Sequence, residues 1–233
     1  MIKGDFYMKK KLLIIVVLMI IAFSVFPQNI KNAVNDYFSY EVHEKNGYWK
    51  DCCSSFLKEN NKDIYFYGYN NLFDKDISTS WVEGVNGSGI NEYLLIPFFK
   101  QDESMFSYKK KKNINIKFQI NNGYCKNESL YKKNNRVKKV KITVYDIPLN
   151  SDINNMFVDG DPVVIFEKII ELQDTSEKQE FNFQTKLVNY DSYCIPFTLI
   201  KMEILDVYKG TDFDDTAISE IEVFGEYITN EDY

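Results

Sequence analysis

Short segments in which apolar and polar residues alternate dominate the chain from Trp49 onward. In Lys138–Tyr145, for example, Val140, Ile142 and Val144 alternate with lysines and a threonine. Such alternation buries one face of a strand and exposes the other, which is typical of antiparallel sheets. The pattern predicts strands, separated by loops rich in Asn, Asp, Gly and Lys, at Trp49–Leu57, Glu92–Phe99, Asn115–Asn121, Lys138–Tyr145, Val163–Leu172, Gln179–Phe183, Phe197–Val207 and Ile218–Tyr227.

The helical period is absent as a long pattern after residue 60, and only a short helix at Ile30–Phe38 is expected. Many short strands with turn-rich connections predict an all-β fold, an antiparallel jelly-roll β-sandwich. No repeat or linker divides the chain, so residues 48–228 are expected to form one domain. Residues 29–47 would be an extension before it, and residues 229–233 a tail.

The N-terminus has the pattern of an export signal. Lys9–Lys11 precede an apolar run, Leu12–Phe26, that only Ser24 interrupts. The run is shorter than the roughly 20 residues that a membrane-spanning helix needs. Residues 1–28 are therefore predicted to be a cleaved signal peptide, with a retained anchor or a buried helix as alternatives and Met8 as an alternative start. We expect a secreted, periplasmic or cell-surface protein that contacts membrane only if this segment stays uncleaved.

Composition and charge limit the classes of molecule that the protein is expected to bind. The chain is 45% hydrophobic and 16% aromatic, which is ample for a packed core. Its formal net charge is −6 and its pI is near 5.0, whereas a nucleic-acid binder needs a basic surface. The lysine run 109–112 is interpreted as a solvated loop. Nucleic acid is therefore not an expected partner.

The cysteines leave the redox state open. Four are present, Cys52, Cys53, Cys125 and Cys194, and an even number in an exported chain permits disulfides. A vicinal bridge between Cys52 and Cys53 would be strained, so pairing of either with Cys125 or Cys194 is one alternative. Free, half-buried thiols are the other.

Catalytic signatures are missing from the sequence. His43 is the single histidine and precedes the predicted sandwich. No Gly-x-Ser-x-Gly elbow, His-Glu-x-x-His motif or Cys/His pair is present. We therefore expect a binding protein without enzymatic activity.

One loop carries the chemistry of a cation site. Asp74 and Asp76 flank a single residue, and hydroxyls follow at Ser78 and Thr79. Ca²⁺ takes about six to eight oxygen ligands, which a tight loop of this kind can supply. The loop is no EF-hand, because that motif needs glycine where Thr79 stands and glutamate where Val85 stands.

The same loop, continued to Trp81, resembles the first-loop motif of galactose-binding-like β-sandwiches. These are the discoidin domains, of coagulation factor five/eight type C, and their bacterial carbohydrate-binding relatives. The segment 217–225, which begins Ala-Ile-Ser-Glu, is similar to their last strand. In that family the first loop and a late glutamate meet at a structural Ca²⁺. The resemblance implies a calcium site made by Asp74, Asp76, Thr79, Glu220 and a backbone carbonyl at Ala217.

A narrower resemblance extends over residues 50–227. Its motifs are Cys53–Leu57, Trp81–Glu92, Ile120–Tyr124, Asn134–Lys138, Ile204–Thr211 and Asp215–Glu220. In this order they resemble the glycan-binding, translocation-associated domain of secreted NAD glycohydrolases. Asn91 departs from the pattern, because a glycine is expected before Glu92.

The resemblance implies a non-catalytic module that binds a glycan, with a cell-surface protein as the alternative partner in an adhesin or adaptor role. Glycan sites use aromatic faces with amide and charged side chains. The candidate ligand residues are Tyr69, Trp81, Asn122, Tyr124 and Arg136. Four of them have a structural alternative: Trp81 in the core, Asn122 and Tyr124 in a turn, and Arg136 in an ion pair.

Overall fold

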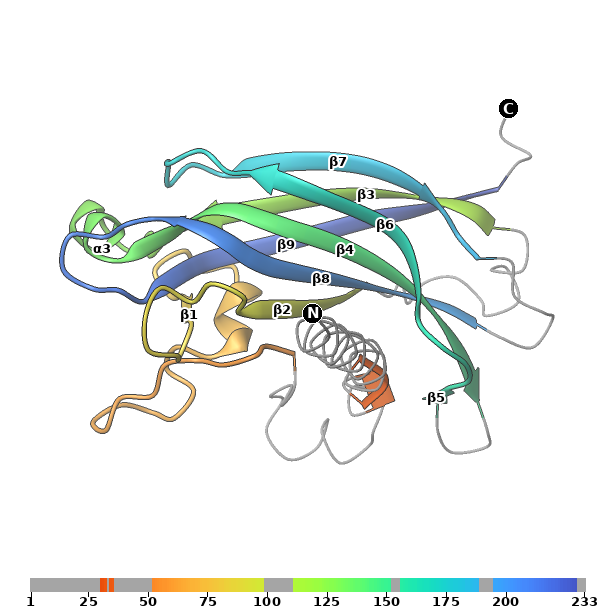
Figure 1. Ribbon diagram of the computed structural model, residues 1–233, viewed down its shortest axis with the longest axis horizontal. Coiled ribbons are helices and arrows are strands. Elements are labelled where there is room, and N and C mark those ends of the chain that lie inside the picture. The colour runs from red at the N-terminus through yellow and green to blue at the C-terminus, as the bar shows by residue number, and fades with distance from the viewer. Residues whose placement is uncertain are drawn as a thin grey trace, which may run out of the picture.

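The described part of the chain, in a computed structural model, comprises residues 30–32, 34–35, 52–98, 111–151, 156–188 and 195–229. Strands dominate it (Figure 1). The elements, in order, are the 3₁₀ helix η1 (Tyr69–Leu72), β1 (Trp81–Val82), β2 (Tyr93–Phe98), β3 (Lys111–Asn122), the helix α3 (Glu128–Lys133), β4 (Asn135–Ser151), β5 (Met156–Val158), β6 (Val163–Glu171), β7 (Gln179–Lys186), β8 (Ile195–Tyr208) and β9 (Thr216–Thr229).

The strands form the two layers of an antiparallel jelly-roll β-sandwich, as the alternation predicts. In one layer, β4 pairs with β8 on one edge and with β6 on the other, and β2 extends the sheet beyond β8. In the other, β3 lies between β9 and β7, and β1 pairs with β9. The layers join at a corner, where Asn135 and Arg136 of β4 pair in parallel with Thr216 and Ala217 of β9. Figure 1 shows β1 and α3 at one end of the molecule and β5 at the other.

The core lies between the layers and is built from the alternating inward positions. Every second residue of β3 from Ile114 to Ile120 is at most 2% exposed. Ile142 and Val144 of β4 and Ile200 of β8 are fully buried as well. Residues of the short helix near Ile30 belong to the same core cluster. The outward positions of β3 and β7 carry polar side chains, among them Asn115, Lys117, Asn182 and Gln184.

The predicted strand at Trp49–Leu57 is wrong over its described residues. From Cys52 onward the segment makes a single bridge, Cys53 with Leu94, on the outer edge of β2. Leu95 N donates to the Cys52 carbonyl at 2.7 Å and Ser54 N to the Tyr93 carbonyl at 2.9 Å, and the Ser54 hydroxyl accepts from Tyr93 N at 2.8 Å, but the pairing goes no further. β1, β5 and α3 are elements that the alternation did not predict, because each is too short to show a period.

Asn91 explains the departure from the family pattern. Its φ is 74°, in the left-handed region that glycine enters without strain. Asparagine tolerates this region better than most other residues. A glycine is expected there because of this backbone conformation, and Asn91 preserves it.

The predictions about the N-terminal segment and the cysteines concern residues that the structure describes only in part. The export signal of residues 1–28 and Cys194 lie outside the described residues. Cys52, Cys53 and Cys125 form no disulfide with one another. Over the described ranges, no helix is long and apolar enough to cross a membrane.

Asp146 is a buried carboxyl at the centre of β4. It is 0% exposed and accepts a hydrogen bond from Val188 N at 2.7 Å, just beyond the end of β7. Burial raises the pKa of Asp146 from 3.8 to about 7, against the opposing effect of the Val188 and Ile147 amides. A carboxyl whose pKa is higher in the folded state favours folding while it is protonated.

We therefore expect stability to fall as pH rises from about 3.8 to about 7 through Asp146, by up to about 4 kcal/mol. Asp146→Asn removes the titration, so the variant will exceed the wild type in stability at pH 8 but not at pH 4. Urea midpoints at both pH values measure this. Asp206→Asn, which alters a carboxyl paired with Lys138 at the surface, is the control. This variant should keep the wild-type loss of stability between pH 4 and pH 8. Equal midpoint differences at the two pH values for Asp146→Asn would refute the assignment.

Candidate functional site

The loop between η1 and β1 is held together by its own aspartates. Asp74 accepts hydrogen bonds from Asp76 N at 2.9 Å and from the Thr79 hydroxyl at 2.7 Å. Asp76 accepts from Ser78 N at 2.9 Å, and its side chain is exposed. Lys75 adopts a φ of 65°, which closes the turn. The loop is therefore a compact oxygen-rich turn that fixes the Asp74 carboxylate and the Thr79 hydroxyl beside each other.

Strand β9 brings Glu220 to this loop. Trp81 faces Ile218 in the β1–β9 ladder, and the Ser80 and Ser219 hydroxyls are 2.8 Å apart. Continuing the same register sets Thr79 opposite Glu220. The pairing of two strands far apart in sequence thus places the late glutamate on the first loop.

Glu220 is buried without a hydrogen-bonding partner among the described residues. The residue is only 3% exposed, and neither carboxylate oxygen makes a hydrogen bond with the described residues. Burial raises its pKa to about 7, and the negative charges of Asp74 and Glu222 add to the effect. The nearby Lys75 amide lowers the pKa but makes no hydrogen bond with either oxygen. A buried carboxylate costs several kcal/mol unless a cation or donors compensate it.

The oxygens gathered here fit a hard cation. Asp74, Thr79 and Glu220 come together, whereas the side chain of Asp76 is directed to Ser78 and the Ala217 carbonyl accepts from Gly123 N at 3.1 Å. Within the described ranges, no three His, Cys, Asp or Glu side chains form a metal-binding group on their own. A Ca²⁺ ion would therefore depend on hydroxyl and carbonyl oxygens beside the carboxylates, a mixture that this ion accepts.

Trp81 and Asn122 have structural roles. Trp81 is 0% exposed, and its indole N–H donates to the Ser55 carbonyl at 3.0 Å. Asn122 is also 0% exposed, and its amide bonds both to Val137 N and to the Val137 carbonyl. It joins the end of β3 to the start of β4. Neither residue presents a surface to a ligand.

Arg136 is likewise committed to the fold. It makes a two-pronged ion pair with Asp174, with N–O distances of 3.0 and 2.7 Å, and donates to the Asn134 and Lys209 carbonyls. The pair raises the pKa of Arg136 and lowers that of Asp174. Through these bonds Arg136 anchors α3 and the β8–β9 loop to β4. It thus has the structural role, in an ion pair, that was the alternative to ligand binding.

The two candidate tyrosines are almost buried. Tyr69 donates its hydroxyl to the Leu95 carbonyl at 2.5 Å and lines a small cavity of about 330 Å³. Tyr124 packs edge-on against Tyr67, with ring centroids 6.3 Å apart. Their exposed fractions are 6% and 8%, which leaves little ring face for a sugar. The five candidate ligand residues therefore do not form a shared open site.

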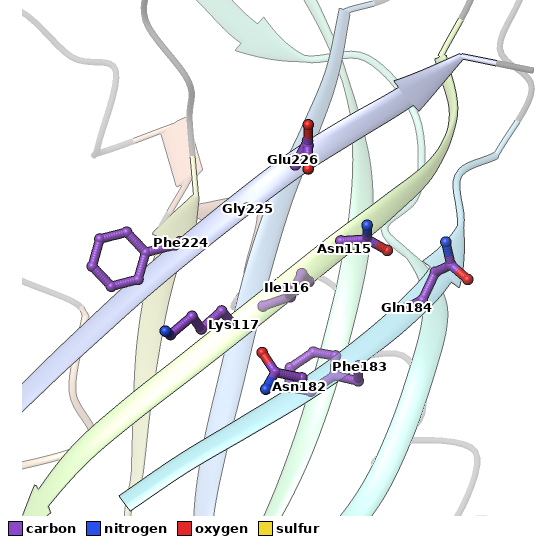
Figure 2. A pocket seen from close by; sticks show the side chains of 9 residues that line it. All are labelled: Asn115, Ile116, Lys117, Asn182, Phe183, Gln184, Phe224, Gly225 and Glu226. Carbon is purple, nitrogen blue, oxygen red and sulfur yellow. The ribbon is translucent and has the colours of Figure 1, made fainter. Parts of the chain in front are cut away.

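An open hollow lies elsewhere, across the outer face of β9, β3 and β7 (Figure 2). Its volume is about 570 Å³, within the range of roughly 300–1,000 Å³ of small-molecule sites. The ladders align its lining in two rows, one of Glu226, Asn115 and Gln184 and the other of Phe224, Lys117 and Asn182. Ile116, Phe183 and Gly225 contribute the floor between the rows.

The side chains of the hollow fall into a bonded group and a free group. Lys117 pairs with Glu180 at 2.7 Å, and Asn182 donates to the same carboxylate at 3.2 Å. These contacts, with one from Gln119, hold the pKa of Glu180 down to about 2. By contrast, no hydrogen bond or ion pair with the described residues engages the side chains in the first row. Phe224, beside them, is 50% exposed.

The hollow offers recognition groups and no catalytic pair. Its lining supplies amides, one carboxylate, one ammonium and an aromatic ring, but no hydroxyl, thiol or imidazole. A nucleophile with an adjacent base would need such groups. His43 lies outside the described residues. Nothing in the sequence points directly to this hollow, although asparagines at strand positions, where they are disfavoured, are a signal of it.

Comparison with solved structures finds remote likenesses only. Solved structures with a similar course include the CBM32 of AlyQ in complex with 4,5-unsaturated mannuronic acid (14% identity, 74% of this chain and 91% of that one, TM-score 0.30). Others are a truncated AlyQ with CBM32 and alginate lyase domains (14%, 75% and 31%, 0.32) and a CBM4 structure (12%, 66% and 82%, 0.30). Such remote likenesses carry no functional argument, and no curated protein matches the chain.

The family model that matches is described as the NAD glycohydrolase translocation F5/8 type C domain, and it matches residues 42–224. The matched range takes in the first loop with Asp74, the β1–β9 junction and Glu220. It also includes the motifs that suggested this resemblance in the sequence. The chain belongs to the NAD glycohydrolase translocation F5/8 type C domain family.

Proposed function

We propose that the chain is a non-catalytic glycan-binding module of the bacterial cell envelope or exterior. The observation that carries the proposal is the hollow on β9, β3 and β7, which sets an exposed Phe224 ring near the amides of Asn115 and Gln184, whose side chains make no hydrogen bond with the described residues. Aromatic faces pack against the apolar C–H side of sugar rings, while amides and carboxylates bond to hydroxyls. The family relationship supports the same class of ligand.

The proposal includes a structural Ca²⁺ at the first loop. Its support is the buried Glu220 carboxylate, which has no hydrogen bond from the described residues, beside the Asp74 carboxylate and the Thr79 hydroxyl. Asp76 and the Ala217 carbonyl remain as further candidate ligands. The ion would supply positive charge beside the buried Glu220 and the exposed Asp74. It would thereby fix the loop against β9, which is a structural role.

An adaptor for another protein is the second candidate. Large apolar side chains are exposed in three loops, namely Ile64, Phe66, Val85, Ile90 and Phe213. The Thr216 hydroxyl, just after the loop with Phe213, donates to the Ser88 carbonyl at 2.8 Å and so links that loop to the one with Val85 and Ile90. Apolar side chains gathered in loops are a feature of protein interfaces.

Phe224→Ala tests the glycan proposal. We expect the full chain to be retarded in native gels that contain a soluble polysaccharide, and the variant to lose at least about tenfold in affinity, since an aromatic anchor supplies much of such binding. Phe213→Ala removes an equally exposed ring from a loop and should bind like the wild type. Retardation lost in Phe213→Ala but kept in Phe224→Ala would place the site in the loops. No reducing ends should be released during incubation.

A further inference from the structure

We propose that the hollow on β9, β3 and β7 selects neutral glycans and rejects acidic ones, through the charge of Glu226. This inference rests on the proposed glycan-binding function and names the ligand class of the same site. The hollow has two charged groups in its lining, Lys117 and Glu226. The group that is available to a ligand decides whether the hollow presents a positive or a negative charge.

Lys117 is already neutralised. Its ammonium lies 2.7 Å from a Glu180 oxygen, and that carboxylate also accepts from Gln119 at 2.7 Å and from Asn182. Three donors thus hold one carboxylate, which stays ionised and keeps the lysine charge matched. An acidic sugar would have to displace Glu180 from Lys117 before it gained an ion pair. In exchange it would leave Glu180 without its cation.

Glu226 is the unmatched charge. It stands one row away on β9, beside Asn115 and Gln184 in register, and no ion pair with the described residues engages it. A carboxylate accepts hydrogen bonds from sugar hydroxyls but repels a uronate or sulfate group. The amides of Asn115 and Gln184 each donate and accept, which suits the paired hydroxyls of a neutral sugar.

The described charges around the hollow leave this arrangement unchanged. Glu222, in the same row as Gln119 and Glu180, is paired with Lys178 at 2.6 Å. Lys186 follows Gln184 on β7, in the row beyond Glu226. Its Cα lies two strands away, roughly 12 Å from that of Glu226 by the spacing of strands and residues, and the two side chains form no ion pair. Salt screens the attraction across such an exposed gap, with a Debye length of about 8 Å at physiological salt, so Lys186 does not neutralise Glu226.

Titration calorimetry with paired ligands tests the inference. The probes are hexasaccharides of glucose, mannose, galactose and N-acetylglucosamine, and a uronate oligosaccharide of equal length, added to the full chain. We expect at least one neutral probe to bind about tenfold more tightly than the uronate. Glu226→Gln should raise uronate affinity about fivefold at low salt, and change neutral binding by less than about threefold because glutamine retains an acceptor. Glu180→Gln, which frees Lys117, should also raise uronate affinity.

The control is Glu171→Gln, which removes a carboxylate of an exposed ion pair with Lys139 on the other sheet. It should leave all affinities unchanged. Uronate binding as tight as neutral binding in the wild type, or no gain in Glu226→Gln, would overturn the charge selection while leaving glycan binding in place. Failure of every probe to bind would instead remove the proposed function itself.

Discussion

Replacing Trp81 with alanine will lower the free energy of unfolding by about 3–5 kcal/mol. The indole is fully buried and packs where β1 pairs with β9, so its loss leaves a cavity between the first loop and the core. The Ser55 carbonyl also loses the indole donor at 3.0 Å. An unpaired acceptor adds its own penalty to the cavity, so the effect should lie toward the upper end of this range.

Urea unfolding, monitored by far-ultraviolet circular dichroism, measures the change. Phe213→Ala provides a matched aromatic control, because Phe213 is 47% exposed and its loss should change stability by no more than about 0.5 kcal/mol. A cost below about 1 kcal/mol for Trp81→Ala would mean that the indole contacts solvent or ligand rather than the core.

Glu220→Gln will abolish stabilisation by calcium. Wild-type protein at a Ca²⁺ concentration of 100 times the dissociation constant should gain about 2.7 kcal/mol of stability, seen as a higher melting temperature. The glutamine variant lacks the buried carboxylate on which the site depends, so its melting temperature should not respond. In EDTA the variant should have the higher melting temperature of the two, because glutamine removes a buried charge that has no hydrogen bond from the described residues.

Glu222→Gln is the control for this experiment. Glu222 lies on the same strand and faces outward, where it pairs with Lys178. It should respond to Ca²⁺ like the wild type. If Glu220→Gln gained as much stability from Ca²⁺ as the wild type, the ion would bind elsewhere and the proposed ligands would be wrong.

The sequence predicted the sandwich because its strands carry their own signal. Alternation along Lys138–Tyr145 and Phe197–Val207 is a local property, so the core face can be read without tertiary information. The two observed strands are longer, Asn135–Ser151 and Ile195–Tyr208, because their ends lack alternation and are set by pairing. The error at Trp49–Leu57 has the same origin, because its pairing with β2 stops after the single bridge of Cys53 with Leu94 and no local pattern shows where pairing stops.

The binding surface was harder to predict. Trp81, Asn122 and Arg136 are residue types that bind sugars when exposed, and only the fold shows that they are buried and bonded to Ser55, Val137 and Asp174. The hollow, in turn, combines residues 115–117, 182–184 and 224–226, whose proximity depends on the register of two ladders. No local pattern contains that register.

A glycan array probed with the full chain in the presence of Ca²⁺ tests the central claim most directly. The account predicts specific binding to neutral oligosaccharides, lost in Phe224→Ala and retained in Phe213→Ala. An array without any glycan signal from correctly folded protein would contradict it, and a specific protein partner recovered by the same sample would then establish the adaptor alternative.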